Sequence, residues 1–316
     1  MAHKISKSGF DDWTEDQLPD LTGKIYLITG GNSGIGFEAA KMLGQAGADL
    51  IIAARNQEKG ERACAELKET SANKVHLVSL DLADMRSIKS CDKEVRIITQ
   101  KLDGLVNNAG LMQTPEQKTK DGFELQFGVN HLGHFLLNGL LFDVVEKASG
   151  RIVVISSIAH KYGRIFWPDP MMRKDYDPMK AYCQSKLANL MYALELDRRL
   201  KAADSGVSVY ACHPGYSRTS LQSTGPSGFF NLLYKILNPI LGQAPKQGAM
   251  PTVLCAAGIE AVSGGYYGPQ KFHETRGRVS DALVEEKALR PDKQAQLWEM
   301  SEELVDFDWS NFLPPA

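Results

Sequence analysis

The stretch KIYLITGGNSGIG, residues 24–36, decides the fold of this chain. Its first six residues form a short apolar run that is typical of a buried strand, and a glycine-rich turn follows. Beyond the turn, residues 34–45 carry apolar side chains at helical spacing. A strand, a glycine turn and a helix in this order direct backbone N–H groups and a helix N-terminus at a phosphate. We therefore expect a nucleotide-binding βαβ unit. A P-loop is excluded, because Phe37 stands where that motif requires lysine.

Short apolar runs alternate with helical patterns along most of the remaining chain. This rhythm predicts right-handed βαβ units and a parallel sheet covered by helices on both faces. Although 316 residues would suit two domains, no Pro/Gly/Ser-rich linker interrupts the alternation, so we expect one α/β domain with a doubly wound, Rossmann-type sheet. The predicted strands are 24–29, 50–54, 75–80, 104–106, 151–155 and 207–211, and the predicted helices are 34–45, 56–70, 84–100, 123–147, 178–201 and 245–257.

Three regions flank or interrupt this domain, which we place at residues 22–265. A polar leader (1–21) precedes it, and a C-terminal extension (266–316) is expected to pack on it. Within it, residues 219–245 include the apolar stretch SGFFNLLYKILNPIL, which we interpret as a lid over a hydrophobic substrate. An amphipathic helix packed on the body or on a partner is the alternative.

Composition and charge exclude several classes of protein. Lysine and arginine (36) nearly balance aspartate and glutamate (38), so there is no electrostatic case for a nucleic acid partner or an anionic membrane. The five cysteines are widely spread without a C-x-x-C pair, which is typical of a reducing compartment and argues against a disulfide framework or a zinc finger. Neither a signal peptide nor a run of about 18 apolar residues is present. We expect a cytoplasmic protein without a transmembrane segment.

The end of the second predicted strand indicates which dinucleotide the turn would take. A typical NAD site has a carboxylate about 20 residues after the glycine turn, and this carboxylate accepts a hydrogen bond from the ribose 2′-hydroxyl. This chain has Ala53-Ala54-Arg55-Asn56 there, and Asp49 lies at the start of the strand. An arginine without a neighbouring carboxylate suits a 2′-phosphate. Arg55 therefore favours NADP(H) over NAD(H), with a solvated surface arginine as the alternative.

The pattern Tyr-x-x-x-Lys occurs three times, and only one copy lies inside a predicted helix. Tyr176–Lys180 straddles a proline that suits a helix start, and Tyr267–Lys271 contains glycine and proline, which predicts a turn. Tyr182–Lys186 lies within the predicted helix 178–201, where side chains four apart converge. The Lys186 ammonium would lower the pKa of Tyr182 and make its phenol a usable general acid/base.

Polar residues gather at the predicted carboxyl edge of the sheet, where open α/β sheets bind their ligands. Ser156 and Ser157 end the strand 151–155, and Asn107–Gly110 follows the strand 104–106. Asn130 lies inside the predicted helix 123–147, where asparagine is unfavourable enough to suggest a function. His131 and His134 share that helix without further ligands at metal spacing, so we expect packing or hydrogen-bonded histidines and no metal. Cys183 is expected to point elsewhere on its helix.

In these motifs the chain resembles the short-chain dehydrogenase/reductase family. The matches are Thr29-Gly30-x-x-x-Gly34-x-Gly36, Asp81-Leu82, Asn107-Asn108-Ala109-Gly110, Asn130, Ser157, Tyr182-x-x-x-Lys186 and Pro214-Gly215. Within the family, the stretches WTEDQLPDLTGK (13–24), NHLGHF (130–135), SSIAH (156–160), AYCQSKLAN (181–189) and CHPGYSRT (212–219) are similar to the retinol dehydrogenase and WW-domain oxidoreductase branch.

The resemblance implies a role for each matching residue. Tyr182 would be the proton donor or acceptor, Lys186 would hold the nicotinamide ribose, Ser157 would bind the carbonyl, and Asn130 would maintain a water-linked proton relay. Ser157 is chosen over Ser156 on its spacing to Tyr182. The cofactor would be lined by Gly30, Asn32, Ser33, Gly34, Ile35, Gly36, Asp81, Leu82, Asn108, Ala109, Gly110, Pro214, Gly215, Ser217 and Thr219.

Together these features predict an NADP(H)-dependent carbonyl reductase or alcohol dehydrogenase with a small hydrophobic substrate. A low-turnover NADP(H)-binding regulatory or scaffold protein of the same fold is the alternative. The membrane-anchored retinol dehydrogenases carry an N-terminal membrane helix that this sequence lacks, which argues against a retinoid substrate. Pairing through the helices 123–147 and 178–201, as in many relatives, would give a homodimer or homotetramer.

Overall fold

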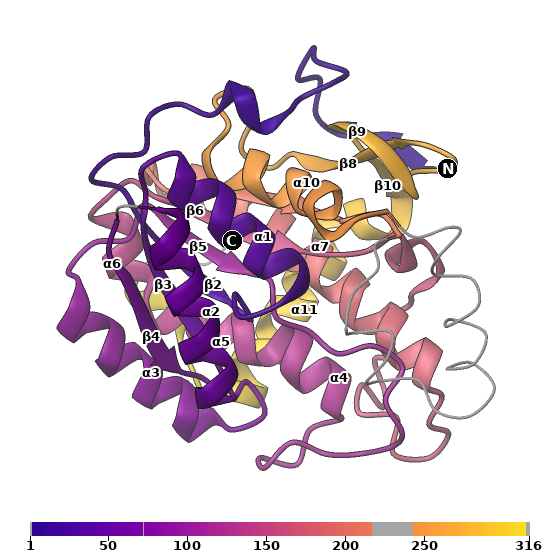
Figure 1. Cartoon of the computed structure of the whole chain (residues 1–316). Coiled ribbons are helices and arrows are strands. Elements are labelled where there is room, and N and C mark those ends of the chain that lie inside the picture. The colour runs from indigo at the N-terminus through magenta and orange to yellow at the C-terminus, as the bar shows by residue number, and fades with distance from the viewer. Residues whose placement is uncertain (1, 72, 217–242, 314–316) are drawn as a thin grey trace.

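The apolar runs of the sequence form one mostly parallel sheet. The computed structural model describes residues 2–71, 73–216 and 243–313, and within them the sheet has eight strands in the order β4-β3-β2-β5-β6-β7-β8-β9 (Figure 1). All neighbours are parallel except β8 and β9. The strands are β2 (Ile25–Thr29), β3 (Asp49–Ala54), β4 (Val75–Ser79), β5 (Gly104–Asn107), β6 (Arg151–Ile155), β7 (Ser208–Cys212), β8 (Tyr266–Lys271) and β9 (Arg276–Asp281).

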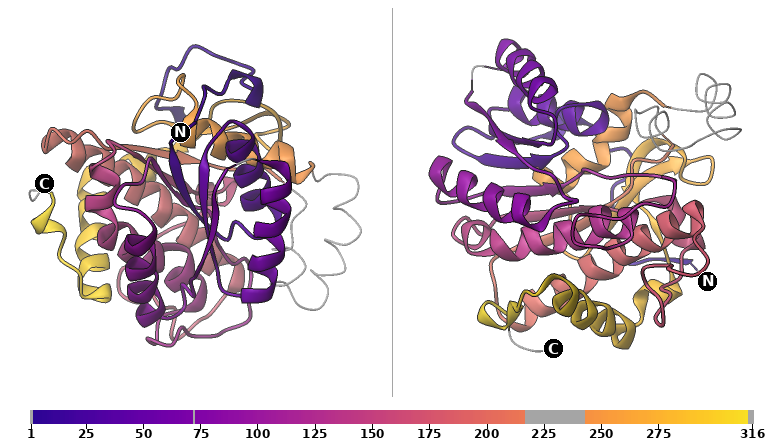
Figure 2. Two further views of the ribbon diagram at one scale, coloured as in Figure 1. Left: turned by 60° about the vertical axis from the view of Figure 1, so that its left-hand side comes forward. Right: turned by 90° about the horizontal axis from the view of Figure 1, so that it is seen from below.

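Helices cover both faces of this sheet, because the inward side chains of each strand alternate between two apolar cores. One core contains α1 (Gly34–Gln45), α2 (Gln57–Thr70) and α10 (Pro245–Ala257). The other contains α3 (Met85–Ile98), α5 (Gly133–Leu140) and α7 (Pro178–Ala202), with α11 (Pro291–Val305) as an outer layer on α7 (Figure 2). The predicted doubly wound α/β class is confirmed.

The predicted helix 123–147 is interrupted in the structure. It is divided into α4 (Leu125–Phe127), a π-helical turn (Gly128–Leu132), α5 and α6 (Phe142–Glu146). At the start of α5, Gly133 packs closely against Leu82, since a Cβ on Gly133 would lie 2.8 Å from the Leu82 backbone oxygen. Asn130 lies in this π turn and therefore not in the interior of a regular α-helix.

The prediction that residues 267–271 form a turn is wrong, because these residues belong to β8. Proline is tolerated there because β8 carries an irregularity in its pairing with β9 between Pro269 and Lys271. Glycine is required at the preceding position, where a Cβ would lie 2.1 Å from His213 Nε2. The sheet thus continues past residue 265, where we expected the domain to end.

The described parts of the leader and of the C-terminal extension pack on the domain. In the leader, Trp13 is buried and its Nε1 donates to Glu260 Oε2 at 2.9 Å, while β1 (Ala2–Lys4) pairs with β10 (Leu283–Glu285). At the other end, Trp298 and Trp309 pack against the Phe135 ring of α5, at 5.1 and 5.8 Å between ring centres. The part of α5 and α7 that these rings contact, where we expected a second copy to pair, is therefore buried within the chain.

Among the described residues, no helix is long and apolar enough to cross a membrane. The predicted lid falls almost wholly on residues 217–242, and it lies outside the part of the chain that the structure describes.

Candidate active site

The glycine turn joins β2 to α1 at the carboxyl edge of the sheet. Gly30 (φ +64°) and Gly34 (φ +56°) both adopt left-handed backbone conformations, which glycine takes without the strain that a Cβ would cause. Gly36 lies so close to Asn108 that a Cβ would stand 2.3 Å from its amide nitrogen. The turn therefore places the backbone and the N-terminus of α1 beside the loop that follows β5.

Thr29 fastens that loop to the turn. Its hydroxyl oxygen accepts from the backbone N–H groups of Asn108 at 3.0 Å and Ala109 at 2.9 Å. The Asn108 side chain also donates to the Thr29 backbone oxygen, at 2.8 Å. All three hydrogen bonds join the end of β2 to the loop after β5. They therefore fix the glycine turn and this loop relative to each other.

A cavity of about 640 Å³ follows the carboxyl ends of the strands, which is within the range of small-molecule sites. Apart from Asn130, it brings together the described residues that the sequence proposed for the cofactor and for catalysis. Ser217 and Thr219 lie outside the described residues. The lining includes Gly30, Asn32, Ser33, Gly34, Ile35, Gly36, Arg55, Asp81, Leu82, Asn108, Ala109, Gly110, Ser157, Tyr182, Lys186, Pro214 and Gly215.

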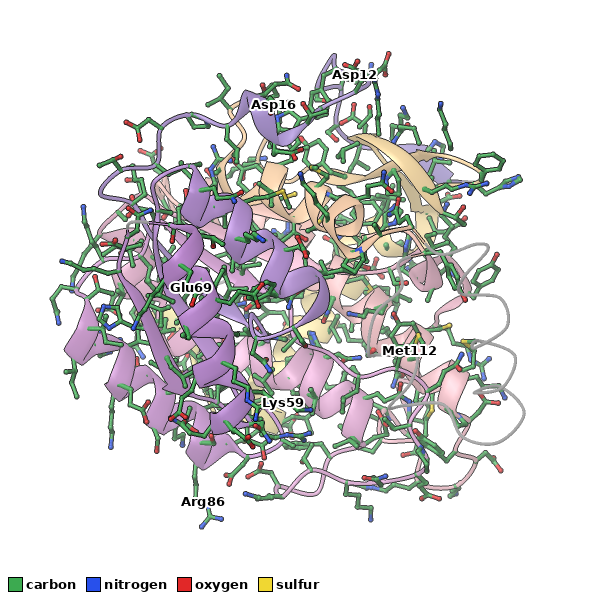
Figure 3. The ribbon with its side chains drawn as sticks, in the orientation of Figure 1. Asp12, Asp16, Lys59, Glu69, Arg86 and Met112 are labelled. Atoms are coloured by element: carbon green, nitrogen blue, oxygen red, sulfur yellow. The ribbon has the colours of Figure 1, made fainter. Side chains whose placement is uncertain are left out.

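One end of this cavity is cationic. Arg55 follows β3, and Lys59 lies in the first turn of α2, where Asn56 caps the helix by accepting from the Lys59 backbone N–H at 2.9 Å. Asp49 begins β3, at the opposite end of the strand. Lys59, labelled in Figure 3, was missed from the sequence because an exposed lysine on a helix carries no signal until the helix is oriented. Two cations and a helix N-terminus fit a phosphate group.

The other end carries the tyrosine and the lysine of α7. Tyr182 is buried and lines the cavity, and the Lys186 ammonium lies 5.9 Å from the centre of its ring. Lys186 Nζ donates to the backbone oxygen of Ile155, at the end of β6, at 3.1 Å. Burial lowers the pKa of Lys186 to about 8. The i, i+4 spacing therefore presents both side chains on one side of α7.

The two serines after β6 have different environments. Ser156 Oγ donates to the backbone oxygen of Lys186 at 2.7 Å and thereby ties β6 to α7. Ser157 Oγ accepts from the Ala159 N–H at 3.2 Å, which leaves its own proton for an oxygen in the cavity. The Ser157 hydroxyl can therefore donate into the cavity, whereas the Ser156 proton is used in the bond to α7.

Ser157 is held from the far side by a buried histidine. His160 Nδ1 lies 2.7 Å from the Ser157 backbone oxygen, and the Tyr266 hydroxyl of β8 lies 3.3 Å from the same ring nitrogen. Burial lowers the pKa of His160 to about 4, so its ring is neutral at physiological pH. The serine backbone is therefore fixed by contacts that do not involve its hydroxyl.

Asn130 is fully buried behind the cavity wall. Its Oδ1 accepts from the Leu111 N–H at 2.7 Å, and its Nδ2 donates to the Leu111 oxygen and to Ser185 Oγ, both at 2.9 Å. A Cβ on Gly110, which does line the cavity, would lie 3.1 Å from Asn130 Oδ1. Asn130 therefore connects the wall of the cavity to α7.

Both histidines beside Asn130 are buried and hydrogen-bonded. His131 Nε2 lies 2.9 Å from Ser301 Oγ of α11, and His134 is bonded to Thr29 and to the Asn130 backbone. Burial lowers the pKa of His131 to about 3 and that of His134 to about 4. Across the described part of the chain, no cluster of three or more histidine, cysteine or acidic side chains could hold a metal ion.

Apolar and sulfur-bearing side chains surround the catalytic end. Met112, Tyr162 and Met179 line the cavity there, and Tyr162 is 80% exposed. Cys183 lines it too, so the expectation that this cysteine points elsewhere is wrong. The sequence did not indicate Met112, Tyr162 or Met179. They come from a loop, the end of a 3-10 helix and the start of α7, and the placement of these segments depends on the whole fold. Figure 3 labels Met112.

Comparison with known proteins agrees with this arrangement. The short chain dehydrogenase family model matches residues 24–227. Retinol dehydrogenase 11 of Homo sapiens is 43% identical over 251 residues, which are 78% of this chain and 77% of that protein. Retinol dehydrogenase 12 of Homo sapiens is 39% identical over 300 residues, which are 94% of this chain and 90% of that protein.

The architecture is shared with a solved structure as well. An uncharacterised protein from Mycobacterium paratuberculosis has a TM-score of 0.79 at 35% identity, and the match covers 95% of this chain and 99% of that one. The predicted resemblance is thereby confirmed. The chain belongs to the short-chain dehydrogenase/reductase family, on its retinol dehydrogenase-like branch.

Proposed function

We propose that this oxidoreductase is NADP(H)-dependent and interconverts a hydrophobic aldehyde or ketone and its alcohol, with Tyr182 as the general acid/base. The observation that carries the proposal is that one cavity joins the glycine turn and the cationic end to Ser157, Tyr182 and Lys186. The family of the chain uses nicotinamide dinucleotides, and a cavity of about 640 Å³ with a glycine turn and a helix N-terminus fits such a group.

The residues of the chain divide the binding of this cofactor between them. The glycine turn and the N-terminus of α1 would hold the pyrophosphate, Asp81 and Leu82 would flank the adenine, and Lys186 would hold the nicotinamide ribose. Arg55 and Lys59 would pair with the 2′-phosphate that distinguishes NADP(H) from NAD(H). When bound, the nicotinamide supplies or accepts a hydride.

The chemistry left to the protein is the placing of one oxygen and the transfer of one proton. In reduction, Ser157 donates a hydrogen bond to the carbonyl oxygen and orients the carbonyl carbon toward the hydride donor. Tyr182 gives its phenolic proton to the same oxygen as the alcohol forms, and it takes the proton back in oxidation. The Lys186 ammonium favours the phenolate form of Tyr182 and so lowers the cost of that transfer.

The apolar end of the cavity supports a hydrophobic substrate. Met112, Tyr162 and Met179 offer contact area without charge, and methionine adapts its shape to the ligand. The relatives named above are retinol dehydrogenases, so retinal belongs among the substrates to be tried. The five cysteines are free and buried, and we propose that the enzyme acts in the cytoplasm.

The proposal is tested by following NADPH oxidation with aldehydes and ketones of rising chain length, with retinal as one member. We expect kcat/KM to rise with chain length, because each added methylene contributes about 0.8 kcal/mol when it is buried. Failure to oxidise NADPH with every carbonyl, combined with tight NADPH binding, would favour the low-turnover regulatory protein instead.

A further inference from the structure

A buried histidine lies between the cofactor end and the catalytic end of the site. His134, in the first turn of α5, is 3% exposed, and both of its ring nitrogens have partners. Its Nδ1 lies 3.1 Å from the backbone oxygen of Asn130, and its Nε2 lies 2.9 Å from Thr29 Oγ1. Thr29 is the residue that holds the Asn108–Ala109 loop, so His134 touches both halves of the site from behind.

The direction of each hydrogen bond follows from the acceptors. A carbonyl oxygen only accepts, so His134 Nδ1 must carry a proton and donate it to Asn130. Burial lowers the pKa of His134 to about 4, so the ring is neutral and Nε2 is a bare acceptor. The Thr29 hydroxyl therefore donates to Nε2, in preference to the Val106 backbone oxygen, which lies farther away at 3.3 Å.

The result is one continuous chain of hydrogen bonds with a single direction. The N–H groups of Asn108 and Ala109 donate to Thr29 Oγ1, the Thr29 hydroxyl donates to His134, and His134 donates to the Asn130 oxygen. Asn130 in turn holds Leu111 and Ser185 through its side chain. The bonds that His134 makes to Thr29 and to Asn130 are buried, and a buried polar group that loses its partner costs free energy.

We propose that His134 is a positioning residue that couples the loop after β5, which lines the cofactor end of the cavity, to Asn130 and through it to α7. It is not among the residues that line the cavity. Its removal releases Thr29 and the Asn108–Ala109 loop on one side and the Asn130 backbone on the other. Cofactor affinity and turnover therefore both depend on it. This inference rests on the proposed function, because the Asn108–Ala109 loop lines the cavity that would hold the cofactor and Asn130 is bonded to Ser185, in the helix of Tyr182 and Lys186.

The test compares substitutions that remove one bond or both. His134→Phe keeps a ring of similar size but removes both bonds. His134→Asn retains a donor near the position of Nδ1, and His134→Gln retains an acceptor near that of Nε2. Each variant is measured by calorimetric NADPH titration, by kcat and KM with an aldehyde, and by thermal unfolding. His131→Phe is the matched control, because His131 lies three residues away, is equally buried and bonds to Ser301 of α11 instead.

We expect His134→Phe to raise the Kd for NADPH and lower kcat by about ten-fold each. His134→Gln should recover more of the NADPH affinity, and His134→Asn more of kcat. In a Thr29→Val background, His134→Phe should change the Kd by less than about two-fold, because the bond that it breaks is already absent. His131→Phe should lower the unfolding temperature with the Kd unchanged.

Equal effects of His134→Phe and His131→Phe on every readout would overturn the inference, because both would then be packing residues alone. If His134→Phe does not fold, the opposite recoveries of the glutamine and asparagine variants decide the matter, and equal recoveries count against the coupling. A parent protein that binds neither NADPH nor NADH would overturn the proposed function as well. One that binds NADPH and turns over normally with His134→Phe would overturn this inference alone.

Discussion

The ammonium of Lys186 lies 5.9 Å from the centre of the Tyr182 ring, on the same side of α7, and it is buried there beside the end of β6. Burial lowers the pKa of this lysine to about 8 from an ordinary value of 10.5. The protein thus holds the Lys186 ammonium at a buried position, where burial disfavours the charged form. A cost in stability follows from that placement.

Replacing this lysine with an apolar side chain should stabilise the cofactor-free protein at neutral pH. Below pH 8 both the folded and unfolded states hold the Lys186 proton, so the folded state carries the full cost of a buried charge. Between pH 8 and 10.5 only the unfolded state binds it, so stability rises with pH. We expect Lys186→Met to raise the free energy of unfolding by up to about 3 kcal/mol at neutral pH, with the gain shrinking above pH 8.

Denaturant unfolding across this pH range, with the exposed Lys180→Met as control, measures the effect. A gain that does not change with pH would contradict the account of Lys186.

Substitution of Ser156 and Ser157 should have different effects on activity and stability. Ser157→Ala removes the hydroxyl that faces the cavity and should lower kcat/KM by about 100-fold with NADPH affinity retained. Ser156→Ala removes the hydrogen bond that joins β6 to the Lys186 carbonyl of α7 and should lower the free energy of unfolding by about 1 kcal/mol, with a smaller loss of activity. Steady-state kinetics and denaturant unfolding of both variants decide the assignment, which fails if Ser156→Ala is the less active enzyme.

Arg55 and Lys59 should control the choice of cofactor. Because both cations line the same end of the cavity, Arg55→Ala and Lys59→Ala should each weaken NADPH binding by about ten-fold. The affinity for NADH, which has no 2′-phosphate, should stay the same. Lys68→Ala, in the last turn of α2, is the control. Titration of both cofactors against each variant measures the effect, and equal affinities of the parent for NADPH and NADH would remove the argument.

The C-terminal segment should contribute strongly to stability. Trp309 is fully buried, with Trp298 and Phe142 at 5.1 and 5.5 Å between ring centres. Trp309→Ala should lower the free energy of unfolding by about 3–5 kcal/mol. Tyr162→Ala, at a side chain that is 80% exposed, should leave it nearly unchanged. A loss below about 1 kcal/mol for Trp309→Ala would show that the segment is dispensable.

Much of the site could be predicted because its signals are local. The glycine turn, the Tyr182–Lys186 pair and Ser157 each follow from a few neighbouring residues. The meeting of Ser157 and the Asn108–Gly110 loop follows from the rule that parallel strands end at one edge of a sheet. That rule needs only the order of strands and helices along the chain, which the alternation of apolar runs predicts.

The remaining features depend on contacts between distant segments. Residues 267–271 contain glycine and proline, yet pairing with β7 and β9 makes them a strand. Asn130 in the π turn bonds to Leu111, and Gly133, directly after the turn, packs against Leu82; the local sequence indicates neither contact. Lys59 and Met112 join the cavity only once α2 and the loop after β5 are placed.

The central claim is that Tyr182 transfers the proton, and Tyr182→Phe tests it most directly because it removes one hydroxyl and keeps the ring. NADPH oxidation by an aldehyde should fall by at least about 100-fold, while the Kd for NADPH, measured by titration of the same variant, should stay within about two-fold of the parent. A Tyr182→Phe enzyme that reduces the aldehyde as fast as the parent would contradict the mechanism.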